Sequence, residues 1–267
     1  MAYEGEGQVT AREILLVCKG HPYERQPFYD VFEGLSSVNY TLVEQPAAQA
    51  LFTPEHAQGY DAFVLYDMPG IQFSSVPGEA PALAEPSPQL MAGLNAMLDA
   101  GVGMVFLHHA IAGWPAWPEY AEIIGGRFLY LPGVVRGKAC PDSGYRHKVT
   151  HTITSEGTHP ILNGVPDSFE ITDELYLYQV FDDVEPLLRS SHTFTQDNFY
   201  SAKAAVVDGK MFDNAGWQHK PGSNLVGWTR QVRNSRIVYL QCGDDPAAYA
   251  NPHYQRLIGN AIDWVSG

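Results

Sequence analysis

The chain has 267 residues, of which 45% are hydrophobic and 17% are charged, which is enough to bury one large core or two small ones. The formal net charge is −14, from 16 basic and 30 acidic residues. Because binding to phosphate groups needs a basic patch, we expect no nucleic-acid partner and no attraction to an anionic membrane surface.

Residues 1–12 are polar and acidic and lack the basic and apolar regions of a secretory signal, so we expect a flexible N-terminal tail. No apolar run approaches the roughly 18 residues that a membrane-spanning helix needs. Cys18, Cys140 and Cys242 are far apart and form no C-x-x-C pair. This odd, scattered set argues against disulfides and favours a cytoplasmic protein.

Through the first half of the chain, short apolar runs alternate with segments of helical spacing. The runs show little polar alternation, which is typical of a parallel sheet covered on both faces. The proline-rich residues 75–88 are too broken for regular structure. The predicted elements, in order, are a strand at 13–20, a helix at about 26–35, strands at 39–45 and 60–70, a helix at 87–101, a strand at 102–109 and a helix at 116–126.

The second half is richer in predicted strands. It shows no internal repeat and no linker, so we predict one α/β domain over residues 1–267, with a mostly parallel sheet and a β-rich extension. The predicted elements are strands at 146–155, 186–194, 204–210, 224–232 and 235–244, a turn followed by a strand within 159–179, and a closing amphipathic helix at 252–267.

Polar or titratable residues follow four of the predicted strands at their carboxyl ends. In open α/β sheets ligands bind beyond these ends, so we expect the four groups to meet at one rim. The four segments are Cys18–His21, Asp67–Gly70, His108–His109 and Cys242–Asp245.

His108 and His109 end a buried strand and precede the small residues Ala110 and Ala112. The pattern is typical of a nucleophile elbow, except that an imidazole stands where the elbow needs a serine or cysteine. Acyl-enzyme chemistry therefore lacks its nucleophile. Because imidazole titrates near neutral pH, proton transfer and metal binding remain, and both histidines are candidate catalytic residues.

Candidate acid partners come from two other segments. Adjacent side chains of a strand face opposite ways, so only one of Asp173 and Glu174 enters the site, and we favour Glu174 as the acid or base. Asp244, after a strand near the C-terminus, is a second candidate catalytic carboxylate. Asp173 and Tyr176 are candidates for substrate binding.

The remaining candidates for substrate binding are histidines and loop residues. His21, Tyr23 and Glu24 follow the first strand, in the loop expected to roof the rim. His147 and His151 are four residues apart and would share one face of a regular strand; we place His151 in the site and His147 at the surface.

No cofactor is expected from the motifs of the chain. There is no G-x-G-x-x-G after the first strand and no P-loop, so a nucleotide is not indicated. There is also no H-E-x-x-H motif, although the number of histidines keeps a divalent metal open.

Five stretches of the chain carry a family resemblance. They are CKGHPYER, YDAFVLYDMPG, VFLHHAIAGWPAWPEYAEIIGGRF, HPILNGVPDSFEITDELY and RIVYLQCGDDPAAYANPHYQRLIGNAIDW. Together they resemble the ThuA-like (trehalose-utilisation) family, from about residue 13 to about residue 265. The resemblance implies a flavodoxin-like three-layer sandwich of the class I glutamine amidotransferase type, without the catalytic cysteine.

The resemblance also indicates which residues form the site. His21, His109, Glu174 and the Gly243-Asp244 corner fall where the family has its polar cluster. Family members often have Gly-His at that corner, so Asp244 is a departure, and a carboxylate there can abstract a proton or bind a sugar hydroxyl. ThuA-like proteins often self-associate, which implies a homo-oligomer.

We predict acid/base chemistry, as isomerisation, elimination or hydrolysis, on a small polyol or 3-keto-sugar derivative, because the family is linked to carbohydrate metabolism. In this hypothesis His108 or His109 removes a proton alpha to a carbonyl, and Glu174 or Asp244 is the partner acid. Two alternatives stay open: a metal-dependent hydrolase using the histidines, and a non-catalytic ligand-binding relic of an amidotransferase fold. Glutamine amidotransferase activity is not expected.

Overall fold

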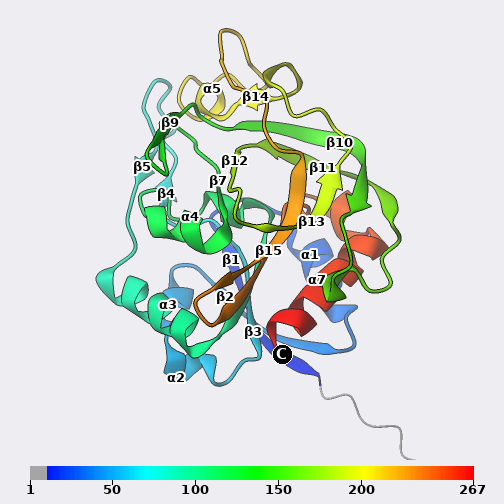
Figure 1. The fold of residues 1–267 in the computed structure, drawn as a ribbon. Helices are drawn as coiled ribbons and strands as arrows, with labels where there is room; N and C mark the ends of the chain where they lie inside the picture. The colour runs from blue at the N-terminus through cyan, green and yellow to red at the C-terminus, as the bar shows by residue number, and fades with distance from the viewer. Residues whose placement is uncertain (1–10) are drawn as a thin grey trace, which may run out of the picture.

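The computed structural model describes residues 11–267, and a ten-stranded sheet flanked by helices forms its centre (Figure 1). The predicted N-terminal tail lies outside the described residues except for its end, since Arg12 already belongs to the first strand. Among residues 11–267, no helix is long and apolar enough to cross a membrane.

The sheet has a parallel half and an antiparallel half. Its strands are β1 (Arg12–Lys19), β2 (Val38–Glu44), β3 (Ala62–Asp67), β6 (Gly103–Leu107), β10 (Gly144–Ser155), β11 (Ser168–Leu177), β13 (Glu185–Ser190), β14 (Tyr200–Ser201), β15 (Leu225–Val232) and β16 (Ser235–Leu240). The order is β11-β10-β13-β15-β16-β6-β3-β1-β2, with β14 paired to β10. Strands β16 to β2 are parallel, and the pairs from β16 out to β11 are antiparallel. The predicted β-rich extension therefore continues the central sheet.

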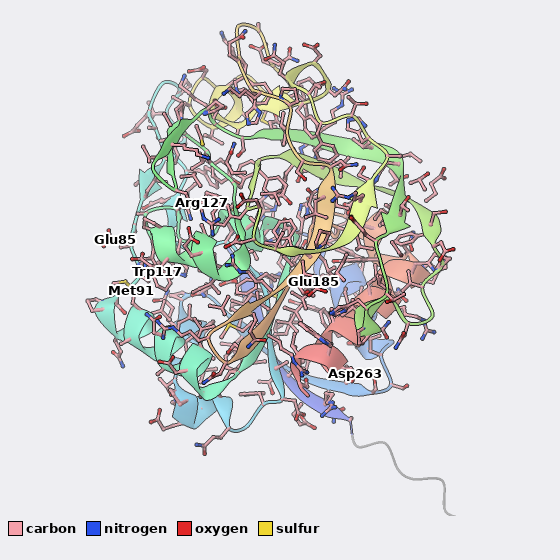
Figure 2. The ribbon with its side chains drawn as sticks, in the orientation of Figure 1. Glu85, Met91, Trp117, Arg127, Glu185 and Asp263 are labelled. Carbon is pink, nitrogen blue, oxygen red and sulfur yellow. The ribbon has the colours of Figure 1, made fainter. Side chains whose placement is uncertain are left out.

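The inner parallel strands β1, β3 and β6 are buried and apolar along their middles because helices cover both of their faces. The helices are α1 (Arg25–Glu33), α2 (Pro54–Ala57), α3 (Pro88–Ala100), α4 (Pro118–Ile124), α5 (Ala202–Val206), α6 (Pro246–Tyr249) and α7 (Pro252–Val265). Leu16 and Val64 pack with α1 and α7 on one face, and Leu15 and Phe63 pack with α3 and α4 on the other. Side chains fill both layers (Figure 2). This is the predicted three-layer α/β sandwich.

Short elements connect the main ones. They are the strands β4 (Ile71–Gln72), β5 (Ala82–Leu83), β7 (Gly126–Arg127), β8 (Gly133–Val135), β9 (Lys138–Cys140) and β12 (Gln179–Val180), and the 3₁₀ helices η1 (Ala47–Leu51), η2 (His108–Ala112), η3 (Pro160–Leu162) and η4 (Gln196–Asn198). Strand β4 precedes the proline-rich stretch and pairs with β5, which lies within it, whereas residues 75–88 were predicted to have no regular structure.

The predicted strand at 204–210 is wrong, because this segment contains most of α5. Ser201 caps the helix: its hydroxyl accepts a hydrogen bond from the backbone N–H of Ala204 at 3.0 Å. The valines at 206 and 207 suggested a strand, but the cap and the alanines before them favour a helix here.

A β-bulge in β10 decides which histidines face the site. The register with β11 shifts between Arg146 and Val149, and Lys148 has a φ of 55°. His151 pairs with Ile171, which packs in the α1/α7 layer, whereas His147 lies beside Glu174. His147 and His151 therefore do not share a face.

Candidate functional site

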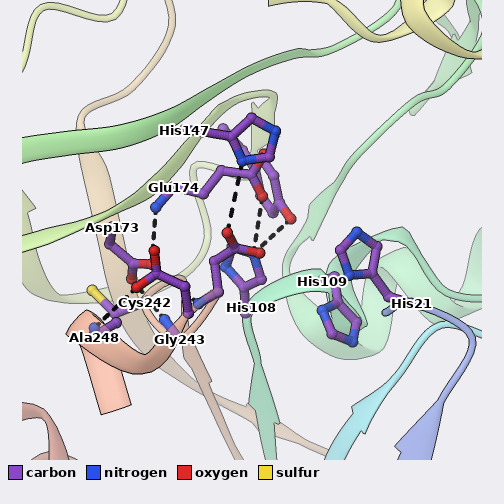
Figure 3. Close-up of polar contacts among 12 residues, drawn as sticks. His21, His108, His109, His147, Asp173, Glu174, Cys242, Gly243 and Ala248 are labelled. Atoms are coloured by element: carbon purple, nitrogen blue, oxygen red, sulfur yellow. Dashed lines mark hydrogen bonds and ion pairs between the residues drawn. The ribbon is translucent and has the colours of Figure 1, made fainter. Parts of the chain in front are cut away.

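The candidate active site lies beyond the carboxyl ends of three parallel strands. The structure brings together His21 after β1, His108 after β6 and Asp244 after β16. The antiparallel half adds His147 from β10 and Glu174 from β11 (Figure 3). Both halves of the sheet thus contribute to one site.

His108 occupies a sharp turn between β6 and η2. Its φ is 46°, in the left-handed region that residues other than glycine rarely adopt. The Tyr239 hydroxyl holds the turn by donating to the His108 carbonyl oxygen at 2.9 Å. This strained strand-to-helix turn has the form of a nucleophile elbow, with an imidazole in place of a nucleophile.

The His108 ring is fully buried and its two nitrogens face different partners. Nδ1 lies 2.6 Å from the carbonyl oxygen of Gln241, so Nδ1 carries a hydrogen. Nε2 lies 3.1 Å from Glu174 Oε2, 3.4 Å from Asp244 Oδ1 and 2.8 Å from the Tyr176 hydroxyl. Burial opposes charge on the ring, but the bonds to the two carboxylates outweigh it and raise the His108 pKa well above its ordinary value.

His147 approaches the same carboxylates. Its Nδ1 lies 3.3 Å from Glu174 Oε1 and 3.7 Å from Asp244 Oδ2. The bond to Asp244 raises the pKa of His147 against the effect of burial. For Asp244, burial favours the neutral acid, but the bonds to both imidazoles lower its pKa below the ordinary value. We call these four residues, His108, His147, Glu174 and Asp244, the histidine–carboxylate cluster.

Asp173 points away from the cluster and holds the corner that carries Asp244. Its carboxylate accepts the backbone N–H of Gly243 at 2.7 Å and that of Asp244 at 3.0 Å. Gly243 has a φ of 117°, and a Cβ there would lie 2.2 Å from the Tyr254 hydroxyl, so this corner needs glycine. Burial raises the pKa of Asp173 to about 7, opposed by His108 and by the two backbone N–H groups. The geometry gives Asp173 a positioning role.

His21 and His109 form a second pair of imidazoles beside the cluster. Their rings are stacked with centroids 4.6 Å apart (Figure 3). His109 Nε2 lies 3.2 Å from the Tyr66 carbonyl oxygen, and its buried Nδ1 has no partner among residues 11–267. Burial lowers the pKa of both rings, reinforced at His21 by His108 and at His109 by His21. This pair is therefore held neutral.

A pocket of about 260 Å³ opens onto the cluster. Its polar lining comes from His21, His147, Glu174 and Tyr176. The rest of the lining is mainly aromatic and apolar, including Phe73, Phe128, Tyr130, Tyr145, Val206 and Met211. His108, His109 and Asp244 stand behind this lining, so a small molecule in the pocket meets Glu174 and His147 first.

Four of the residues expected to bind substrate lie outside the pocket lining, and Asp173, described above, is one of them. Tyr23 packs edge-on against Tyr66, with ring centroids 5.2 Å apart. Glu24 is exposed at the start of α1. His151 is buried beyond the bulge, with Nδ1 2.8 Å from the Ser190 hydroxyl.

His147 was not among the predicted site residues, although it lines the pocket. Tyr145, two residues before it, pairs with Tyr176 across the strands, and that alternation continues to His147. This alternation is the feature of the sequence that could have placed His147 in the site. No feature of the sequence indicates the bulge at Lys148, because neither glycine nor proline marks it.

The cluster also has the donor set of a divalent-metal site. One ligand atom from each of His108, Glu174 and Asp244 can be chosen so that all three lie within 4.8 Å of one another. His108 donates its other ring N–H to a backbone carbonyl, as metal-binding histidines do. An imidazole nitrogen with two carboxylates suits zinc, manganese or iron.

Comparison with known proteins places this site in a family context. The family model described as trehalose utilisation (ThuA) matches residues 14–265. A ThuA-like protein from Parabacteroides merdae is 15% identical with a TM-score of 0.66, over 96% of this chain and 90% of that chain. One from Bacteroides uniformis is 16% identical with a TM-score of 0.62, over 99% of this chain and 95% of that chain.

A more distant likeness concerns the fold alone. PurLQS from Thermotoga maritima is 13% identical with a TM-score of 0.50, over 95% of this chain and 99% of that chain. A comparison with curated proteins gave no match. Together with the parallel core of the sheet, these likenesses show a glutamine amidotransferase-like fold.

Proposed function

The chain belongs to the ThuA (trehalose utilisation) family, and from that premise we propose that it catalyses proton transfer on a keto sugar. The proposal depends on one observation: Glu174 and His147 lie side by side in the pocket lining, 3.3 Å apart. A carboxylate and an imidazole at this spacing supply a base and an acid that reach the same small molecule.

Glu174 is the proposed base and His147 the proposed acid. Glu174 takes the proton from a hydroxyl-bearing carbon next to the ketone, and the C–H electron pair moves into the carbon–carbon bond as the C=O π bond opens. His147 donates a proton to the ketone oxygen, which leaves a neutral enediol. Return of a proton to the former carbonyl carbon, with loss of the O–H proton from the neighbouring enediol carbon, gives isomerisation. Departure of a group β to the carbonyl, with loss of the enol O–H proton as the ketone re-forms, gives elimination.

The other residues support this step from within the pocket lining and from behind it. His108 lies between Glu174 and Asp244, so it keeps two negative charges together in a buried place. Tyr176, which contacts His108 and lines the pocket, and the neutral ring of His21 are placed to hydrogen-bond sugar hydroxyls.

Solvent deuterium exchange tests the step before the final product is known. A 3-keto-glucoside is incubated with the protein in D₂O, and the hydrogens next to the ketone are followed by NMR. We expect catalysed exchange by the wild type and a loss of about 10³-fold in Glu174→Gln, within the range of general base catalysis.

Glu170→Gln is the matched control, because Glu170 is exposed on the same face of β11 and makes no side-chain contact with the cluster. It should exchange at the wild-type rate. Equal exchange by Glu174→Gln and the wild type would contradict the proposal. Binding of the sugar without any exchange would favour the ligand-binding alternative.

A metal-assisted form of this chemistry is the second candidate, favoured by the close approach of ligand atoms from His108, Glu174 and Asp244. A bound divalent metal would act as a Lewis acid toward negative charge on the ketone oxygen. Elemental analysis of protein purified without added metal tests it. Near-stoichiometric metal that is lost in Asp244→Asn supports this candidate, and undiminished exchange by metal-free protein after chelation rules it out.

A further inference from the structure

The pocket beside the cluster has a polar inner end and an apolar outer wall. His147 and Glu174 mark the inner end, while Phe128 and Tyr130 form part of the wall. Two segments distant in sequence complete the wall: Phe73 after β4, and Met211 in the loop after α5. The loops that carry these two residues are in contact, since the backbone N–H of Gly78 donates to the carbonyl oxygen of Val207 at 2.6 Å.

The wall continues onto the surface as an apolar rim, formed by Phe73, Met211 and Phe212. These side chains are 42%, 54% and 56% exposed, and they are three of the six large apolar side chains exposed among residues 11–267. Phe212 reaches back to the cluster, with its ring centroid 5.9 Å from that of His147. Exposed apolar groups gathered at the mouth of a polar site indicate an apolar binding partner.

The size of the pocket decides between a compact and an extended ligand. Its volume of about 260 Å³ is below the roughly 300–1,000 Å³ of pockets that enclose drug-sized ligands. A ligand with a sugar ring at Glu174 and a second ring must therefore extend through the mouth, where the apolar rim covers it. A small free polyol would leave the rim in water.

From this continuity of polar end, apolar wall and apolar rim, we infer that the substrate is a glycoside with an apolar, preferably aromatic, aglycone. This inference rests on the proposed function, because it places the sugar ring at Glu174 and His147. The aglycone lies between Phe73 and Met211, where burial of an aromatic ring adds binding free energy that the sugar alone lacks.

Calorimetric titration with methyl β-glucoside and phenyl β-glucoside tests the inference. Neither ligand has a ketone, so affinity is measured without turnover. We expect the phenyl glycoside to bind about tenfold more tightly, the effect of burying one ring edge. In Phe73→Ser/Met211→Ser this ratio should fall to about threefold or less. Val134→Ser removes an exposed apolar side chain outside this pocket and should leave the ratio unchanged.

Equal affinities, absence of binding by both glycosides, or a ratio that survives the double substitution would each overturn the inference. Sedimentation of the same proteins distinguishes the rival occupant, a second copy of the chain. If the double variant changes a dimer into a monomer while the ratio persists, the rim is a self-association surface. If deuterium exchange fails while the ratio behaves as expected, the proposed reaction is wrong and the ligand class stands.

Discussion

Two pairs of imidazoles lie in one site and are driven toward opposite charge states. His108 and His147 share two carboxylates, and the pKa of each is raised. His21 and His109 stack on one another, and the pKa of each is lowered, first by burial. One pair is therefore protonated at a pH at which the other pair is neutral.

The difference in pKa comes from the groups that contact each imidazole and not from how deeply the ring is buried. His108 and His109 are neighbours in the chain, and their side chains are almost equally buried, at 0% and 1% exposure. Only His108 touches Glu174 and Asp244. A buried imidazole holds a charge only where an opposite charge compensates its desolvation, and this rule lets one elbow carry a cationic and a neutral ring.

Removing a carboxylate should have a large effect on this comparison. In Asp244→Asn the two cationic rings lose one counter-charge but keep their packing, so the charges around Glu174 change. We expect deuterium exchange to fall by about 10²-fold, a typical contribution of one acid/base partner. Asp182→Asn, at a fully exposed carboxylate, is the control. A wild-type exchange rate in Asp244→Asn would show that the charge of Asp244 plays no part.

The next comparison is between the two histidines on either side of the bulge. His147→Asn removes the proposed acid and should lower exchange by about 10²-fold, with binding of the glycoside much less affected. His151→Asn makes the same chemical change four residues away, behind the sheet, and should leave exchange within about threefold of wild type. A large loss of exchange in both variants would mean that the strand is regular in solution, so that His151 faces the substrate together with His147.

The parallel half of the sheet could be predicted from the sequence because burial on both faces leaves unbroken apolar runs. The strand ends then gave His21, His108 and Asp244 a common edge. Glu174 could be chosen over Asp173 because side chains of a strand alternate, and the structure places these two residues on opposite sides of β11.

The antiparallel half was harder to predict because its contacts depend on register. A single extra residue at Lys148 puts His147 and His151 on opposite faces of the strand, and no glycine or proline in the sequence marks this bulge. The pocket wall was missed for a related reason. Phe73 and Met211 are far apart in the chain and meet only through loops whose course follows from tertiary contacts.

Replacing a neutral ring should have a smaller effect than replacing a charged one. His109→Phe keeps an aromatic ring against His21 and removes a buried Nδ1 that has no partner in the described part of the chain. We expect exchange within about threefold of wild type. The unfolding free energy should fall by about 1 kcal/mol, because the bond to Tyr66 is lost. His108→Phe, by contrast, removes one of the two cationic rings that Glu174 and Asp244 share and should lower exchange far more. Loss of exchange in His109→Phe would instead give His109 the catalytic role that the sequence suggested.

His151 offers a direct test, outside the site, of the rule that a buried imidazole without a carboxylate partner stays neutral. Burial lowers its pKa from 6.5 to about 4, with a further contribution from His192. Between these two values the unfolded chain takes up a proton that the folded chain does not, so the wild type loses stability as pH falls below 6.5. Asparagine does not titrate, so the destabilisation caused by His151→Asn should shrink by about 2 kcal/mol between pH 7.5 and pH 5. Urea unfolding at both pH values measures it, with His56→Asn as the exposed control. A constant or growing difference would mean that His151 is charged in the folded protein, so that burial without a carboxylate does not keep an imidazole neutral here.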